Sequence, residues 1–391
     1  MRSMNRAERR ARLALRHRLS APARTDDVLD IARSVLVLHA TDPATVFLSV
    51  AARSVHAVPA AVEKALYGDR TLLRMLAMRR TMFVAPTDLV PVLQASTANG
   101  LAARQRATYA RMIGRGSDIA DAPALFTRAE EAAHAALLAR GEATGAQLSA
   151  DVPLLRTQVD PAPGKSYSRP TNITTWVLVT LGCEGRIVRG RPNGSWTSSQ
   201  YMWSPVETWL PGGIEDLPAA EARADLVRRW LRAFGPAPAA DLKWWTGWTA
   251  GDVKKALALL DVTEVDLDGA TGIVLSDDLE PAPAPEPWAA LLPALDPTPM
   301  GWQERGWFLG AHRPRLFDRN GNIGPSVWWD GRIVGGWAQR RDGEIAVRLL
   351  EDVGADAESA VEREAARMAE WFGDVRAIPR FRTPLERELT A

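Results

Sequence analysis

The sequence predicts an α+β fold in which three tandem winged-helix units precede a C-terminal β-barrel-like domain. Two observations lead to this fold class. Several short helices followed by a β-hairpin recur three times within the first 280 residues, as expected for repeated structural modules. After a proline-rich linker at residues 282–287, the pattern changes to short strands separated by Asn-Gly and Asp-Gly turns. A chain of 391 residues is also long enough to bury more than one hydrophobic core.

The first winged-helix unit is expected over residues 1–120. Apolar side chains at helical spacing predict helices at residues 5–18, 26–38, 43–54 and 59–66. The first of these is arginine-rich and is expected to be basic on its exposed face. Residues 71–78 and 81–84 then form two predicted strands joined by Arg79-Arg80. Helices followed by a basic hairpin are the layout of a winged helix.

The same layout predicts a second unit over residues 121–212 and a third over residues 213–280. The second contains predicted helices at 126–140 and 172–184, with a helix-turn-helix entry at 141–152, and strands at 185–190 and 195–203. The third contains predicted helices at 219–234, 239–246 and 249–260 and strands at 263–267 and 272–275. Pro192-Asn193-Gly194 and Asp268-Gly269 supply the turns of the two hairpins.

The C-terminal domain is expected over residues 288–391. Its predicted strands lie at 307–309, 326–329, 332–337 and 345–350, and a helix follows at 358–372. The turn dipeptides Asn320-Gly321, Asp330-Gly331 and Asp342-Gly343 separate the strands. This pattern predicts a small β-barrel or meander.

Composition excludes several classes of function. The single cysteine, Cys183, rules out an internal disulfide and a cysteine-based zinc site, and the five histidines lack zinc-ligand spacing. No glycine-rich phosphate loop or other cofactor motif occurs, so we expect neither a cofactor nor a metal. The apolar runs are too short to span a bilayer, and the N-terminus lacks a signal-peptide pattern. A cytoplasmic, nucleoid-associated protein is therefore expected.

Charge is distributed unevenly along the chain. Residues 1–115 carry 19 Lys and Arg against 8 Asp and Glu, although the whole chain has a net charge of only +1. Such asymmetry is typical of a polyanion-binding N-terminal half. A GC-rich coding bias also explains abundant arginine, but it does not explain the asymmetry of sign.

The segment His39–Asp42 is the one candidate for catalysis. In an extended backbone, His39 and Thr41 point to the same side, where they could hold a water between a base and a hydroxyl. The structural alternative is that Thr41-Asp42-Pro43 is a helix N-cap followed by proline at the first helical position. Spacing alone leaves both interpretations open.

The chain resembles the winged-helix DNA glycosylases, a family that includes azinomycin-resistance and bacterial interstrand-crosslink glycosylases. The stretches that carry the resemblance are Leu36–Pro43, Arg74–Met82, Trp230–Pro236, Leu291–Pro297 and Asp330–Gly335. They occur in the family's order and span almost the whole chain. The resemblance implies three winged helices and a C-terminal β-barrel around duplex DNA. It also implies monofunctional excision of bulky or crosslinked N7-alkylguanine.

One departure from the family pattern falls within the candidate catalytic loop. The family carries Gln-x-Gln or Gln-x-Asp where this sequence has His39-Ala40-Thr41. An N7-alkylated guanine is already cationic and leaves without a general acid, so the enzyme mainly has to position water. We expect His39 to orient the water and accept a proton, and Thr41 to fix it. Asp42 would supply negative charge near the sugar unless it caps the helix.

The expected DNA contacts lie on the first hairpin. Arg79 and Arg80 would contact phosphates at the wing tip, with Arg74 and Arg53 nearby; alternatively, Arg79-Arg80 is only a solvated turn. The expected partner is duplex DNA, with damaged DNA as substrate, and no membrane or metal is involved. Without a dimerisation helix, the protein is expected to be a monomer. The rival hypotheses are a non-catalytic regulator or damage-recognition scaffold, and a pseudo-enzyme that recognises damage.

Overall fold

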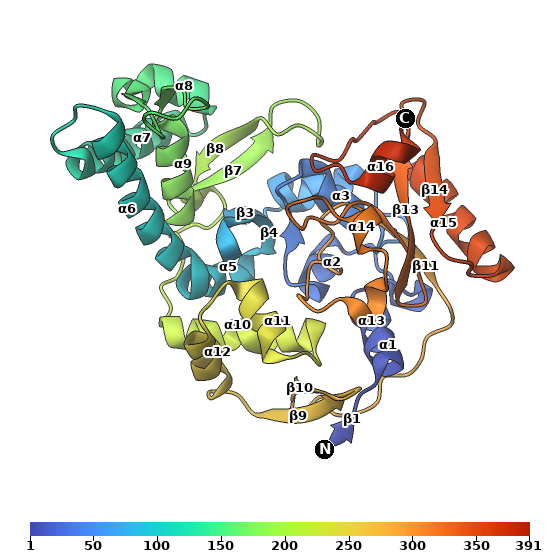
Figure 1. Cartoon of the computed structure of the whole chain (residues 1–391). Coiled ribbons are helices and arrows are strands. Elements are labelled where there is room, and N and C mark those ends of the chain that lie inside the picture. Colours follow the sequence, from blue (N-terminus) through green and yellow to red (C-terminus); the bar gives the residue numbers. More distant parts are fainter. The chain divides into compact units, whose positions relative to one another are not determined.

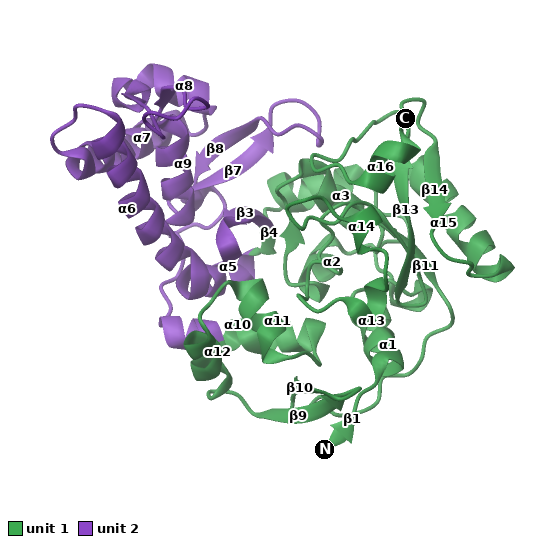
Figure 2. Ribbon diagram, in the orientation of Figure 1, with its two compact units in different colours: residues 1–72, 84–86, 224–391 green, residues 73–83, 87–223 purple.

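The computed structural model describes all 391 residues, and it shows a mixed α and β protein made of two compact units (Figure 1). Unit 1 comprises residues 1–72, 84–86 and 224–391, and unit 2 comprises residues 73–83 and 87–223 (Figure 2). The boundaries of the four predicted domains therefore do not coincide with the two units. The division into four domains stays a prediction.

Four of the five arginines of the first helix are buried or half-buried, contrary to the expected exposed basic face. Helix α1 (Arg6–Arg16) begins where the Asn5 side chain accepts a hydrogen bond from the Glu8 amide. Arg12 is 2% exposed, and both Arg12 and Arg16 form ion pairs with Asp278. The basic face of α1 is thus neutralised within unit 1. Part of the positive charge counted along the N-terminal half is unavailable to a polyanion.

The next helices of unit 1 confirm the predicted pattern with shorter bounds. They are α2 (Val28–Ser34), α3 (Pro43–Ala51) and α4 (Pro59–Glu63). The Asp27 side chain caps α2 and the Asp42 side chain caps α3, as expected for Asp at helix N-termini. Every residue of α3 is buried, so this helix lies inside the core of unit 1.

The predicted third hairpin is present. Helices α10 (Ala219–Phe234), α11 (Ala239–Thr246) and α12 (Ala250–Leu257) precede the antiparallel strands β9 (Val262–Leu267) and β10 (Ala270–Leu275). Asp268 and Gly269 between the strands have positive φ, as a tight hairpin turn requires. The two-residue strand β1 (Arg2–Ser3) adds to β9 in parallel, a pairing that the sequence did not predict.

The C-terminal sheet is open, which corrects the prediction of a β-barrel. It contains four antiparallel strands in sequence order, and its outer strands do not pair with each other. They are β11 (Ala289–Leu292), β12 (Ser326–Trp329), β13 (Arg332–Gln339) and β14 (Ile345–Leu349). Helix α15 (Ala355–Phe372) packs against β11 and β14, and α16 (Pro384–Leu389) packs against β13. With one face covered by a helix, four strands bury a core without closing.

One predicted strand is wrong. Residues 307–309 belong to the helical turn α13 (Gly306–Leu309), and a second turn, α14 (Arg313–Leu316), follows it. Trp307 and Phe308 contact each other edge to face, and both rings contact Trp302. An aromatic cluster therefore decides the local backbone here, overriding the strand propensity of these residues.

Unit 2 contains its own core. Its helices are α5 (Val90–Leu93), α6 (Asn99–Gly116), α7 (Ala122–Arg140), α8 (Gly145–Asp151) and α9 (Thr174–Cys183). Its other strands are β5 (Gln158–Val159), β6 (Thr171–Asn172), β7 (Ile187–Pro192) and β8 (Tyr201–Pro205). Buried side chains between Tyr109 and Trp203 form one continuous apolar cluster. Helix α6 was missed by the sequence analysis.

The first hairpin is formed by β3 (Leu72–Leu76) and β4 (Met82–Pro86), which are neighbours in one sheet. The Ala77 amide donates to the Thr81 carbonyl at 3.1 Å, and the chain turns through Arg79 and Arg80. The predicted basic turn between two strands is therefore present.

Candidate active site and nucleic-acid interface

The segment predicted to be catalytic connects strand β2 (Leu38–His39) to helix α3. His39 is 8% exposed and Thr41 is half-buried. The Thr41 amide lies 3.4 Å from His39 Nδ1 and points its hydrogen toward it. Because Nδ1 accepts this hydrogen bond, the neutral imidazole carries its proton on Nε2. The structure thus brings the two residues together within one short loop.

Asp42 is a helix cap. Its Oδ1 accepts a hydrogen bond from the Ala44 amide at 3.1 Å, and its Oδ2 accepts one from the Arg380 amide at 2.8 Å. Burial raises the pKa of the Asp42 carboxyl, against the opposing effect of these two amides. Both carboxylate oxygens accept backbone hydrogen bonds, which is the helix-cap alternative that the sequence left open for Asp42.

Arg380 was not identified by the sequence analysis, although it holds the candidate loop in place. Besides the bond from its amide, its guanidinium lies 3.5 Å from the Thr41 carbonyl. Arg380 lies in the segment between α15 and α16, 338 positions after Asp42. No local pattern connects residues so far apart, and the pairing becomes visible only in the folded chain.

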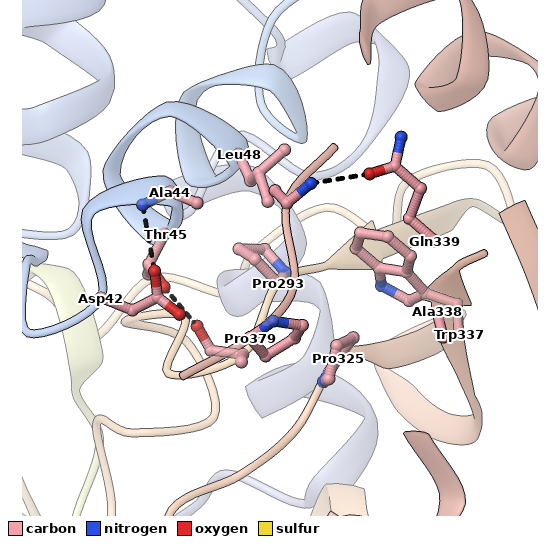
Figure 3. A pocket seen from close by; sticks show the side chains of 12 residues that line it. Asp42, Ala44, Thr45, Leu48, Pro293, Pro325, Trp337, Ala338, Gln339 and Pro379 are labelled. Atoms are coloured by element: carbon pink, nitrogen blue, oxygen red, sulfur yellow. Dashed lines mark hydrogen bonds between the residues drawn. The ribbon is translucent and has the colours of Figure 1, made fainter. Parts of the chain in front are cut away.

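A small cavity lies beside this loop (Figure 3). Its volume is about 20 Å³, and its lining includes Asp42, Thr45, Leu48, Trp337 and Gln339. This volume suits one water molecule. A purine base does not fit, so this cavity is not a binding pocket for an excised base.

Arg53 is part of the core, which removes it from the proposed DNA contacts. Its side chain is fully buried and forms a two-pronged ion pair with Asp296, with nitrogen–oxygen distances of 2.7 and 2.8 Å. Burial by itself would raise the pKa of the Asp296 carboxyl, but Arg53 lowers it below its ordinary value. A guanidinium engaged in this way cannot contact a phosphate.

The ion pair continues into a buried polar chain within unit 1. Arg53 donates to the Thr298 hydroxyl at 2.7 Å, and that hydroxyl lies 2.8 Å from His17 Nδ1. His17 Nε2 lies 3.1 Å from the Ala233 carbonyl, which can only accept, so the proton of the neutral ring is on Nε2. Burial, followed by the nearby Arg53 charge, lowers the pKa of His17 to about 3.

The remaining predicted DNA contacts differ from one another in exposure. Arg79 and Arg80 are exposed at the hairpin turn, where both have positive φ. Arg74 is 3% exposed, and its guanidinium stacks over Tyr201 at 4.8 Å. The turn arginines thus retain the position expected of a DNA contact, while Arg74 is a packing residue at the base of the hairpin.

Several other large side chains are structural. Trp245 and Trp328 are buried. Arg305 is buried between Trp244 and Phe317, and it donates to the Pro299 carbonyl. No group of three or more His, Cys, Asp or Glu side chains is placed to hold a metal ion, and no helix is long and apolar enough to cross a membrane.

Comparison with known proteins gives concordant matches. The model of the family described as DNA glycosylase AlkZ-like matches residues 32–371. An interstrand DNA cross-link repair glycosylase from Streptomyces sahachiroi is 30% identical over 162 residues, a match that covers 39% of this chain and 43% of that protein. The aligned region is thus less than half of that relative's length.

Among solved structures, the Streptomyces sahachiroi DNA glycosylase AlkZ superposes with a TM-score of 0.75. The superposition covers 96% of this chain and 98% of the other, at 20% sequence identity. At this identity the likeness establishes a shared mixed α+β fold. The family match, in contrast, includes the loop that carries His39 and Thr41.

Proposed function

This chain belongs to the AlkZ-like family of DNA glycosylases, and we propose that it hydrolyses the N-glycosidic bond of bulky or crosslinked N7-alkylpurines in duplex DNA. The observation that carries the proposal is the family match over residues 32–371. The relative described as an interstrand DNA cross-link repair glycosylase supports the class of lesion.

The reaction needs little acid catalysis from the protein. Alkylation at N7 makes the purine cationic, so the bond between C1′ and N9 breaks with its electron pair moving onto the base, which leaves neutral. Water then forms the new C1′–oxygen bond and releases one proton to solvent. The main task of the protein is to place that water and to stabilise the oxocarbenium-like transition state.

We assign the placement of water to His39 and Thr41. The Thr41 hydroxyl makes no hydrogen bond within the protein and is half-buried, so it is available to a water molecule. With Nδ1 of His39 accepting from the Thr41 amide, the Nε2–H of the neutral ring is a donor. In this tautomer His39 orients water and does not accept its proton at Nε2. Asp42 and Arg380 act as positioning residues for the loop.

We also propose that the three hairpins β3–β4, β7–β8 and β9–β10 are the wings of three winged helices. Each follows a group of helices along the chain. The first carries Arg79 and Arg80 at its turn, the position from which a wing contacts phosphates.

The test is base release from a duplex oligonucleotide that carries one N7-alkylguanine, either a methyl or a bulky or crosslinked adduct. The wild type is expected to release the base, and His39→Ala to lower the single-turnover rate by about 10²-fold, because the water is misplaced. Thr41→Val should also slow release, and Thr41→Ser should restore it. His56→Ala, which changes an exposed histidine, is the matched control.

Either of two outcomes would contradict the proposal. Absence of release from every adduct, with duplex binding intact, would favour a non-catalytic DNA-binding protein. Release at the wild-type rate by both His39→Ala and Thr41→Val would move the chemistry out of this loop.

A further inference from the structure

One face of helix α6 carries three exposed arginines. Arg104, Arg111 and Arg115 are separated by seven and four residues, so they lie along the same side of the helix. None of the three forms an ion pair. Arg106 lies on another side of α6 and pairs with Glu130 and Glu184. The helix therefore has one neutralised side and one side of uncompensated positive charge.

A hollow opens beside this face. It has a volume of about 430 Å³ and lies between the C-terminal half of α6 and the loop around residues 161–167. Arg111, Arg115 and Lys165 line it together with Tyr167, which is 78% exposed. No Asp or Glu lines the hollow. Its cationic groups therefore face a concave surface without a counter-charge.

Local structure explains only part of this arrangement. Arg111 donates to the Ala107 carbonyl, which satisfies a nitrogen but does not neutralise the charge. Arg115 lies in the last turn of α6, where a cation interacts favourably with the helix dipole. Neither effect accounts for Arg104 or for Lys165 on the facing loop. Elsewhere in unit 2, the exposed Arg140 and the half-buried Arg186 pair with Asp151 and Glu131.

We propose that this face, the α6 basic face formed by Arg104, Arg111, Arg115 and Lys165, binds the phosphate backbone of duplex DNA. Guanidinium groups recognise phosphate oxygens through paired N–H donors, and the exposed Tyr167 hydroxyl adds a donor beside them. From Arg104 to Arg115 the helix rises about 16 Å. That length is enough for contacts to more than one phosphate of a strand.

The α6 basic face would thus add DNA contacts to those proposed for the hairpin turn. Because phosphate contacts carry no sequence information, it should bind any duplex. The inference rests on the proposed function only in taking DNA as the partner. It does not require that the chain release a base.

The test compares two triple variants on undamaged duplex DNA over a series of salt concentrations. Arg111→Gln, Arg115→Gln and Lys165→Gln together remove three unpaired charges. The matched control combines Arg140→Gln, Arg186→Gln and Arg228→Gln, which removes three charges that have carboxylate partners. Both variants change the net charge equally. Circular dichroism and thermal unfolding verify that each remains folded.

The α6 variant is expected to bind more weakly at low salt. The slope of the logarithm of the binding constant against the logarithm of salt concentration should fall by about 2 to 3, near 0.9 for each lost phosphate contact. The control should change the slope by less than about 0.5. Single-turnover base release at saturating protein should match the wild type.

Equal slopes for the α6 variant and the control would overturn the inference. Failure of the proposed function is distinguishable, because it would abolish base release while leaving the difference in slope intact.

Discussion

His17 is a buried histidine that must stay neutral. It is completely buried in unit 1 and hydrogen-bonded to the Thr298 hydroxyl and the Ala233 carbonyl. A second proton would go onto Nδ1, where the hydroxyl also accepts from the nearby Arg53 guanidinium. The protonated ring would therefore place a second positive charge next to Arg53 in the core.

We expect this histidine to make unfolding sensitive to mild acid. Its pKa is about 3 in the folded chain, below the ordinary value near 6.5. Unfolded chains therefore bind more protons between these values, and the free energy of unfolding falls as the pH decreases from 6.5 toward 3. Between pH 7 and pH 5 the expected loss is about 2 kcal/mol. Urea unfolding at the two pH values measures it.

His17→Gln provides the comparison, because glutamine retains a donor and an acceptor but does not titrate. The variant should lose about 2 kcal/mol less than the wild type over the same pH interval. If wild type and variant lose equal amounts, another group causes the acid sensitivity.

At the scale of single elements, the first hairpin has an unusual turn. The turn from Met78 to Thr81 is closed by a hydrogen bond from the Thr81 amide to the Met78 carbonyl. Both central residues, Arg79 and Arg80, have positive φ, at 55° and 61°. Asn-Gly is the preferred pair for such turns, whereas bulky residues are conformationally disfavoured there. The chain keeps two arginines at a position that disfavours them, as expected if their charge has a function.

Replacing Arg79-Arg80 by Asn-Gly should separate stability from binding. Asparagine and glycine adopt a positive φ at a lower energetic cost than arginine. The change is therefore expected to raise the free energy of unfolding by about 1–2 kcal/mol, as measured by thermal or urea unfolding. Loss of two cations should weaken duplex binding and lower its salt slope by about 2. A double variant that combines Arg79→Lys with Arg80→Lys, which keeps the charge but not the paired donors, serves as the comparison.

Wild-type affinity of the Asn-Gly variant would show that the hairpin turn makes no phosphate contact. A decrease in stability would show that the arginines are favourable where they are, through contacts of their side chains.

The sequence predicted secondary-structure elements well where neighbouring residues determine the backbone conformation. Asp268-Gly269 and Asp330-Gly331 form the predicted turns, with positive φ at each residue. Helix α6 was missed because its buried positions include polar or small residues such as Gln105 and Ala102, which weaken the apolar period. The sequence also could not predict that the C-terminal sheet is open. Closure of a sheet into a barrel depends on whether its outer strands pair with each other, and the residue pattern of a single strand does not determine this pairing.

In the candidate site, too, local features were predicted and contacts between distant residues were not. The placement of His39 and Thr41 in one loop followed from their spacing, and it is present in the structure. Arg53 was predicted to contact DNA because a sequence does not show which arginines find a buried carboxylate. Its partner, Asp296, lies 243 positions later.

At the scale of the whole molecule, unit 2 is nearly continuous in sequence, whereas unit 1 is assembled from separated segments. One apolar cluster of unit 2 lies between Tyr109 and Trp203, within the continuous segment of residues 87–223. Unit 1 instead depends on distant pairings, such as Met4 packing against Val265 and Val274.

We therefore expect a fragment of residues 87–223 to fold by itself. It should show helical circular dichroism and a cooperative thermal transition, because the apolar cluster from Tyr109 to Trp203 lies wholly within the fragment. A fragment of residues 224–391 should lack such a transition, since it has lost α1 and β1. A non-cooperative transition for residues 87–223 would mean that this segment depends on residues 73–83 or on unit 1 for its stability.

The hydrogen bond from the Arg380 amide to Asp42 has a consequence for biosynthesis. The ribosome makes the candidate loop first, but the residue that completes its anchoring is added 338 positions later. A nascent chain, or one cut short by a premature stop codon, would carry the loop without this anchor. Only chains that extend past Arg380 would then present His39 and Thr41 in a fixed arrangement. A shorter translation product would lack the loop arrangement on which the proposed base release depends.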